Sequence, residues 1–197
     1  FMAVEGYFHT RSFKRYALRM LLFAVLSEVP FDLMYGGTVF YPVHQNVIWT
    51  LLLGLLGIRL MEAARAKGKR WLYVLTCAAV VVLGFALGTL GMVDYYGAGV
   101  LTVFAFYFFR ERKWWCLLGQ LAALYWLNVV VLGGQMYPVT LFGREIELCE
   151  QGLALLALVP IWLYRGRQGH HSKAFQYACY AFYPAHMLVL ALLTMIQ

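Results

Sequence analysis

The sequence predicts an all-α, polytopic integral membrane protein built as a bundle of about seven transmembrane helices. Hydrophobic residues make up 63% of the 197 residues and charged residues only 13%, against roughly 45–50% and about 25% in an ordinary globular domain. A globule of this length cannot bury so large an apolar excess, because much of its chain lies near the surface. The composition therefore excludes a soluble enzyme, a disordered regulator and a disulfide scaffold.

Apolar runs long enough to cross about 30 Å of hydrocarbon recur along the whole chain. The seven expected spans are residues 16–34, 46–62, 71–90, 95–109, 114–132, 148–164 and 175–196. The fourth and sixth are short, so we expect them to tilt or to borrow flanking residues. No internal repeat or polar stretch large enough for a soluble domain interrupts these runs, and residues 1–197 are expected to form one transmembrane domain.

The basic residues gather in every second loop, and this pattern predicts the topology. By the positive-inside rule, the loops that carry them face the cytoplasm, here beneath a bacterial inner membrane. Residues 35–45, 91–94, 133–147 and the C-terminus at Gln197 are then external. The net charge of +7 is explained by anchoring to the lipid bilayer, and nucleic acid is not an expected partner. The side expected to be cytoplasmic holds 15 of the 16 Lys and Arg residues, all except Arg144: Arg11, Lys14, Arg15, Arg19, Arg59, Arg65, Lys67, Lys69, Arg70, Arg110, Arg112, Lys113, Arg165, Arg167 and Lys173.

The N-terminal residues combine an abrupt start with a candidate charge pair. Phe1 lies in apolar sequence with no basic segment before it, unlike a signal peptide, so we interpret the sequence as N-terminally incomplete with an upstream helix missing. Glu5 and His9 lie four residues apart and share a helix face. Two interpretations stay open, a simple ion pair at a helix end or a catalytic pair with His9 as general base.

Two carboxylates lie near the external end of the first span. Glu28 and Asp32 are four residues apart, and Pro30 between them is expected to break or kink the helix. Like charges so placed do not favour stability, which indicates a function. Either one carboxylate stays protonated, or the two together receive a cationic group.

Further polar residues lie at the same external level or within the last span. Asn46 begins the second span and Asp94 begins the fourth, giving an acidic and amide-bearing outer mouth. His186 lies near the middle of the last span, after Tyr183 and Pro184. A neutral imidazole at this depth can serve as general base, although a hydrogen-bonded structural role is the alternative.

The inner side carries cations within apolar sequence. Arg19 and Arg59 either extend their charged ends towards the interface or form a cationic vestibule for a phosphorylated ligand. No P-loop, G-x-S-x-G or H-E-x-x-H motif occurs, which argues against an ATPase, a serine hydrolase or a zinc protease. The four cysteines are scattered and form no C-x-x-C pair, so no metal site is predicted.

An ordered series of short motifs spans nearly the whole chain. The motifs are Glu5–Arg11, Lys14–Tyr16 with Arg19, Ser27–Asp32, Asn46–Leu52, Asp94–Gly97 and Tyr183–His186. In this order they resemble the TraX family. The resemblance implies an integral-membrane acetyltransferase, because the founding member acetylates the N-terminus of conjugative pilin with acetyl-CoA as donor. Family members usually begin with a helix that carries an Asp-His pair, and that pair is absent from these residues.

The residues and the resemblance together give one functional hypothesis. An acetyl group moves from cytoplasmic acetyl-CoA to an amine or hydroxyl at the membrane or the external face, on a peptide N-terminus, a glycan or a small amine. Either His9, beside Glu5, or His186 takes the acceptor's proton. Arg11, Arg15, Arg19 and Arg59 bind the CoA phosphates, and Glu28, Asp32, Asn46, Asp94 and Tyr183 bind the acceptor. The alternative is a small transporter or exporter whose buried charges line the pathway.

Overall fold

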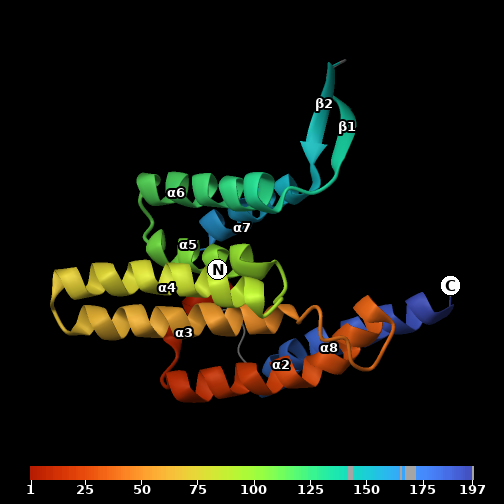
Figure 1. The fold of residues 1–197 in the computed structure, drawn as a ribbon, viewed down its shortest axis with the longest axis horizontal. Coiled ribbons are helices and arrows are strands. Elements are labelled where there is room, and N and C mark those ends of the chain that lie inside the picture. Colours follow the sequence, from red (N-terminus) through yellow and green to blue (C-terminus); the bar gives the residue numbers. More distant parts are fainter. Residues whose placement is uncertain (142–143, 165, 167–171, 197) are drawn as a thin grey trace.

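Three antiparallel helices form the centre of the molecule in a computed structural model that describes residues 1–141, 144–164, 166 and 172–196. They are α3 (Val47–Ala66), α4 (Arg70–Leu90) and α5 (Tyr96–Phe108), which pack on one another (Figure 1). Their buried side chains, among them Leu55, Ile58 and Phe104, form the core. Asn46 begins α3 as its N-cap, because its side chain accepts a hydrogen bond from the backbone amide of Ile48.

Small residues let these central helices approach closely. A Cβ atom at Gly97 of α5 would lie 2.5 Å from the backbone oxygen of Phe85 in α4. At Gly57 of α3 it would lie 2.6 Å from the ring of Phe104 in α5. Small residues at such crossings are typical of helix packing within membranes, where backbone proximity replaces the hydrophobic driving force available in water.

A second pair of helices flanks this centre. α2 (Phe13–Gly36) packs against α3 and lies alongside α8 (Lys173–Ile196) (Figure 1). The side chain of Ser12 caps the start of α2, and Gly37 ends it in the left-handed conformation with φ of 65°. Of the two effects expected of Pro30, a break or a kink, the break does not occur, since α2 continues through this residue for a further turn and a half.

The remaining elements lie on the other side of the centre or beside it. α1 (Met2–His9) is a short N-terminal helix, and α6 (Trp114–Tyr125) continues without interruption as a π-helix, η1 (Trp126–Leu132). Next come strands β1 (Met136–Leu141) and β2 (Arg144–Cys149), the 3₁₀-helix η2 (Glu150–Ala157) and α7 (Leu158–Leu163). The two strands form an antiparallel hairpin that projects from the bundle (Figure 1).

The hairpin corrects two expectations. The fold is mostly helical rather than all-α, and residues 133–147 are not a simple loop. The expected span at 148–164 begins inside β2 and becomes helical only at Glu150. Alternation of charged and apolar residues through Glu145, Ile146, Glu147 and Leu148 is the strand period, and it outweighs the hydropathy that suggested a helix there.

Four helical segments are long and apolar enough to cross a membrane: Val47–Ala66, Arg70–Leu90, Trp114–Leu132 and Tyr177–Thr194. They correspond to the expected spans 46–62, 71–90, 114–132 and 175–196. Of the other three, residues 16–34 form most of α2, and 95–109 and 148–164 correspond to the shorter apolar helices Tyr96–Phe108 and Glu150–Leu163. The chain is therefore a helical membrane protein with four candidate spans among its described residues.

The helix directions bring the basic loops together. The α3–α4 loop, the α5–α6 loop and the start of α2 lie towards the same end of the bundle (Figure 1), which we call the basic end. The loops before α3 and before α5 lie at the opposite end with the hairpin, and we call this the hairpin end. Arg165 and Arg167 lie outside the described residues.

Candidate functional site

A buried polar cluster forms where α2 meets the start of α3. The Oε2 atom of Glu28 accepts a hydrogen bond from the indole Nε1 of Trp49, at 2.8 Å, and another from the Nδ2 atom of Asn46. Asn46 is completely buried and also donates to the backbone oxygen of Ala24 at 2.8 Å. The Oε1 atom of Glu28 is buried without a hydrogen-bond partner among the described residues. One carboxylate oxygen is thus held in place, and the other is left for a donor that the described chain does not supply.

Tyr183 of α8 faces this cluster. Its hydroxyl group is buried and makes no hydrogen bond within the described part of the chain. It lies near the backbone amide of Val47, the first residue of α3, and within electrostatic range of Glu28 and Asp94. The first amides of a helix have no partner inside the helix and carry its positive dipole end. The hydroxyl and this helix start therefore form an electropositive corner beside a carboxylate.

Asp32 and Asp94 belong to neighbouring networks at the hairpin end. Asp32 is only 2% exposed, and its Oδ2 atom accepts from the backbone amide of Tyr41 at 2.9 Å while Oδ1 is without a partner among the described residues. The Oδ1 atom of Asp94 lies 3.4 Å from Nε2 of His44, whose ring stacks on Tyr35 with centroids 4.7 Å apart. The hydroxyl of Thr50 donates to the backbone oxygen of Asp94 at 2.7 Å.

The loop that holds Asp94 is strained. Three non-glycine residues, Met92, Tyr95 and Tyr96, have φ angles of 49°, 59° and 50°. Such conformations each cost of order 1–3 kcal/mol and persist only where surrounding contacts impose them. The backbone amide of Gln45 donates to the oxygen of Met92 at 2.9 Å and ties this loop to the segment before α3. Strain of this kind indicates that the position of Asp94 is specified.

Burial makes Asp94 a pH-sensitive element. Desolvation raises the pKa of Asp94 above its ordinary value, and this effect outweighs that of His44, which lowers the pKa. A carboxyl with a raised pKa keeps its proton in the folded protein at pH values where the unfolded chain has lost it. Its contribution to the free energy of unfolding therefore falls as pH rises through that window.

We expect Asp94→Asn to remove this pH-dependent loss of stability. The Tm of the variant minus the Tm of the wild type should therefore increase as pH rises from about 4 towards neutral. Thermal melts of the detergent-solubilised protein measure the difference. Glu111→Gln is a control with the opposite sign, because the hydrogen-bonded Lys113 lowers the pKa of Glu111. The Tm of this variant minus the Tm of the wild type should decrease over the same pH range. A difference for Asp94→Asn that is constant with pH would contradict this account.

A cationic pocket opens at the basic end, between α1 and the start of α2. Its volume is about 440 Å³, and its walls include His9 and Tyr16. Three arginines, Arg11, Arg15 and Arg19, line it. The structure thus brings together three of the four arginines expected to bind phosphates. The fourth, Arg59, lies on α3 with its guanidinium carbon 5.9 Å from the ring centroid of Phe13 and does not line this pocket.

An apolar groove continues from the cationic pocket towards the cluster around Glu28. Its volume is about 400 Å³. The groove shares Tyr16 and Arg19 with the pocket and extends along α2, α3 and α8 as far as Tyr183. Its lining residues are Met2, Ala3, Tyr16, Arg19, Met20, Phe23, Ile48, Leu51, Cys179, Tyr180 and Tyr183. The two cavities adjoin at Tyr16 and Arg19, and the groove reaches Tyr183, the residue that faces the cluster around Glu28.

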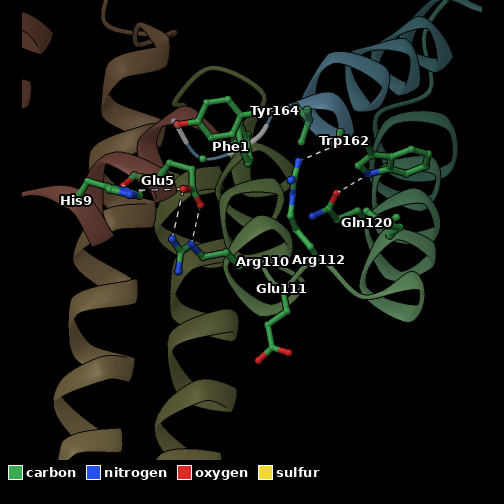
Figure 2. Close-up of a pocket in the computed structure, with 12 residues that line it drawn as sticks. Phe1, Glu5, His9, Arg110, Glu111, Arg112, Gln120, Trp162 and Tyr164 are labelled. Carbon is green, nitrogen blue, oxygen red and sulfur yellow. Dashed lines mark hydrogen bonds and ion pairs between the residues drawn. The ribbon is translucent and has the colours of Figure 1, made fainter. Parts of the chain in front are cut away.

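Glu5 and His9 lie beside a third cavity, of about 310 Å³ (Figure 2). Glu5 forms a two-point ion pair with Arg110, whose Nε and Nη2 atoms lie 2.7 and 3.3 Å from the two carboxylate oxygens. The Nδ1 atom of His9 lies 2.8 Å from the backbone oxygen of Glu5 but 3.8 Å from its carboxylate. Glu5 and His9 are therefore neighbours, as expected, but Arg110 is the main partner of Glu5.

His186 lies beside Tyr183, with the two ring centroids 5.3 Å apart. Its ring stacks on Phe182, with centroids 5.0 Å apart, and its Nδ1 atom lies 3.0 Å from the backbone oxygen of Phe182. It does not line the groove or the cationic pocket. The structure thus groups Glu28, Asn46 and Tyr183, places Asp32 and Asp94 in adjacent networks, and brings His9 to the three arginines. No group of three or more His, Cys, Asp or Glu side chains within the described residues could hold a metal ion.

Sequence reasoning missed Trp49, Tyr16 and His44. Trp49 lies three residues after Asn46, so both side chains share the face at the start of a helix. That spacing could have identified Trp49 as a second donor to the same carboxylate. The roles of Tyr16 and His44 depend on contacts between distant segments, which no local spacing reveals.

The fold and the site define a helical membrane protein that holds buried polar groups between its helices. The family model described as TraX protein matches residues 1–194, and the chain belongs to this family. The chain is also 26% identical, over 200 residues, to the probable fimbrial assembly protein FimC, serogroup H1, of Dichelobacter nodosus. That alignment covers 96% of this chain and 75% of the relative. No solved structure matches.

Proposed function

We propose that the protein is a membrane-embedded acetyltransferase. Acetyl-CoA binds at the basic end, and its acetyl group is transferred to an amine or hydroxyl of an acceptor held beside Glu28. The observation that carries the proposal is that the cationic pocket adjoins the apolar groove at Tyr16 and Arg19. A donor with a polyanionic head and a long, weakly polar arm requires such a pair of cavities.

The chemistry of the two cavities suits the two parts of CoA. Guanidinium groups form strong charge-assisted hydrogen bonds with phosphate oxygens, often two at a time. Arg11, Arg15 and Arg19 supply three such groups for the diphosphate and the 3′-phosphate. The groove beyond them is lined mainly by apolar side chains and accommodates the pantetheine arm. The thioester would then reach Tyr183, at the far end of the groove.

The acceptor would be bound from the hairpin end. The free oxygens of Glu28 and Asp32 are hydrogen-bond acceptors without donors among the described residues, which suits an ammonium or hydroxyl group. Asn46 holds Glu28 in position, and Asp94 adds negative charge nearby. The hydroxyl of Tyr183 would donate to the oxyanion of the tetrahedral intermediate.

The orientation follows from the charges. The basic end faces the cytoplasm of a bacterial cell with its inner membrane around the bundle, and the hairpin end and the C-terminus face outwards. The relative from Dichelobacter nodosus is named a probable fimbrial assembly protein. This name and the TraX family favour the N-terminus of a pilus subunit as the acceptor, over a glycan or a small amine.

Stabilisation by ligand tests the proposal. Acetyl-CoA at 100 times its Kd should add about 2.7 kcal/mol to the free energy of unfolding and raise the Tm of the purified protein in detergent. Dephospho-CoA, which lacks the 3′-phosphate, should stabilise less, and pantetheine should not stabilise measurably at the same concentration. Radiolabelled acetyl-CoA added to membranes from expressing cells should leave label on an acceptor, compared with membranes from cells without the protein.

The results of these binding and transfer experiments distinguish an acetyltransferase from a transporter. No rise in Tm at millimolar acetyl-CoA, together with no transfer of label, would overturn the proposal and favour a transporter whose pathway the buried charges line. Equal stabilisation by acetyl-CoA and pantetheine would show that the cationic pocket does not bind the phosphates.

A further inference from the structure

We infer that Glu28 is the residue that takes the proton from the acceptor, through its Oε1 atom, and the inference rests on the proposed acetyltransferase function. The sequence suggested His9 or His186 for this role. The side chain of His9 is 60% exposed, and the ring of His186 packs against Phe182 and Tyr183. Neither offers a buried acceptor atom that lacks a donor among the described residues, whereas Oε1 of Glu28 does. Tyr183, where the groove ends, lies within electrostatic range of Glu28.

The two carboxylate oxygens of Glu28 differ in their hydrogen bonds. Trp49 and Asn46 both donate to Oε2. Asn46 is itself fixed, because it donates to Ala24 and caps α3 through its Oδ1 atom. With two side chains at the start of α3 holding Oε2, the carboxylate cannot rotate freely. Oε1 is left buried and without a donor from the described residues, as required of an atom that accepts a proton from a bound substrate.

Tyr183 and the start of α3 supply the other requirement of acyl transfer. The hydroxyl of Tyr183 is buried and makes no hydrogen bond within the described residues, and it lies near the first amide of α3. Both are donors for the negative oxygen that develops when the thioester carbonyl is attacked. A proton acceptor on α2 and a hydroxyl donor on α8 thus lie within electrostatic range of each other, with the start of α3 next to the hydroxyl.

The reaction balances with these groups. An acceptor R–NH₂ or R–OH attacks the carbonyl carbon of the thioester, forming a C–N or C–O bond, while Oε1 of Glu28 takes its proton. The tetrahedral intermediate collapses, the C–S bond breaks, and the CoA thiolate leaves. The proton passes from Glu28 to the sulfur, giving the acetylated acceptor and free CoA thiol and returning Glu28 to its carboxylate form.

Three variants of the full chain test the role. Glu28→Gln keeps an acceptor oxygen for Trp49 and Asn46 but cannot take a proton. It should bind acetyl-CoA with wild-type affinity and transfer label to membrane acceptors at least about 100-fold more slowly. Glu28→Gly should be equally slow and should recover activity when sodium formate, a small carboxylate, is added. Glu62→Gln is the matched control, because Glu62 is a hydrogen-bonded glutamate near the basic end, bound to Tyr107 at 2.6 Å, and should transfer at the wild-type rate.

Each result decides one point. Transfer by Glu28→Gln within about threefold of wild type would overturn the role of Glu28 and leave the acetyltransferase proposal intact. If the wild type neither binds acetyl-CoA nor transfers label, both proposals fail. If Glu28→Gln does not fold, the formate experiment decides, since rescue of Glu28→Gly requires a carboxylate in the chemistry and its absence in folded protein contradicts the inference.

Discussion

Acetyl transfer by a Tyr183→Phe variant is expected to fall by about 100-fold, because one donor to the developing oxyanion is lost. The thermal stability of the same variant should be unchanged or higher. The hydroxyl of Tyr183 is buried without a hydrogen bond among the described residues, and an unpaired buried hydroxyl costs roughly 1–3 kcal/mol. Loss of activity with a gain in stability is the signature of a group retained for function.

Tyr107→Phe provides the matched control for this variant. The hydroxyl of Tyr107 donates to Glu62 at 2.6 Å, within the bundle and near the basic end. Its removal leaves Glu62 without this donor and should destabilise the protein by about 1–3 kcal/mol without slowing transfer. Rates measured with saturating acetyl-CoA, together with Tm values in the same detergent, compare the two. A Tyr183→Phe variant that transfers at the wild-type rate would remove its hydroxyl from the mechanism.

Replacing Arg11, Arg15 and Arg19 together by Gln should raise the Kd for acetyl-CoA by roughly 100-fold. These side chains are exposed, so each phosphate contact is assigned only about 1 kcal/mol, at the upper limit for a surface ion pair. Three such contacts sum to about 3 kcal/mol, which corresponds to somewhat more than 100-fold in affinity. Equilibrium binding of radiolabelled acetyl-CoA measures the change. Binding to the wild type should also weaken as salt concentration rises.

A second triple variant separates a specific pocket from a general effect of charge. Lys67, Lys69 and Arg70 are exposed at the same end of the bundle but lie on the α3–α4 loop and at the first residue of α4, and they do not line the cationic pocket. Their replacement by Gln lowers the net charge equally and should change the Kd by less than about threefold, because exposed charges beyond roughly 8–10 Å are screened at physiological salt. Equal losses in the two variants would show that CoA is attracted only by the overall charge of this end.

Local sequence predicted the features that depend on one segment at a time. The helices α3, α4, α6 with η1, and α8 lie close to the expected boundaries, because hydropathy over a window the length of a bilayer depends on composition alone. Competing local signals produced the errors. The strand period around Ile146 lay beside an apolar run, and Pro30 was accommodated within α2 although proline usually interrupts a helix.

The sequence by itself determined that the chain is a helical membrane protein and that its cations gather on alternate loops. It also showed that Glu28, Asn46 and Tyr183 are polar residues in or beside apolar segments, where they indicate a function. Only the tertiary structure decided that Trp49 and Asn46 occupy the same oxygen of Glu28, that Tyr183 faces the start of α3, and that Glu5 pairs with Arg110. The reason is physical. Hydrophobicity and charge act on each segment separately, whereas a hydrogen bond between side chains on different helices depends on the packing of all the helices between and around them.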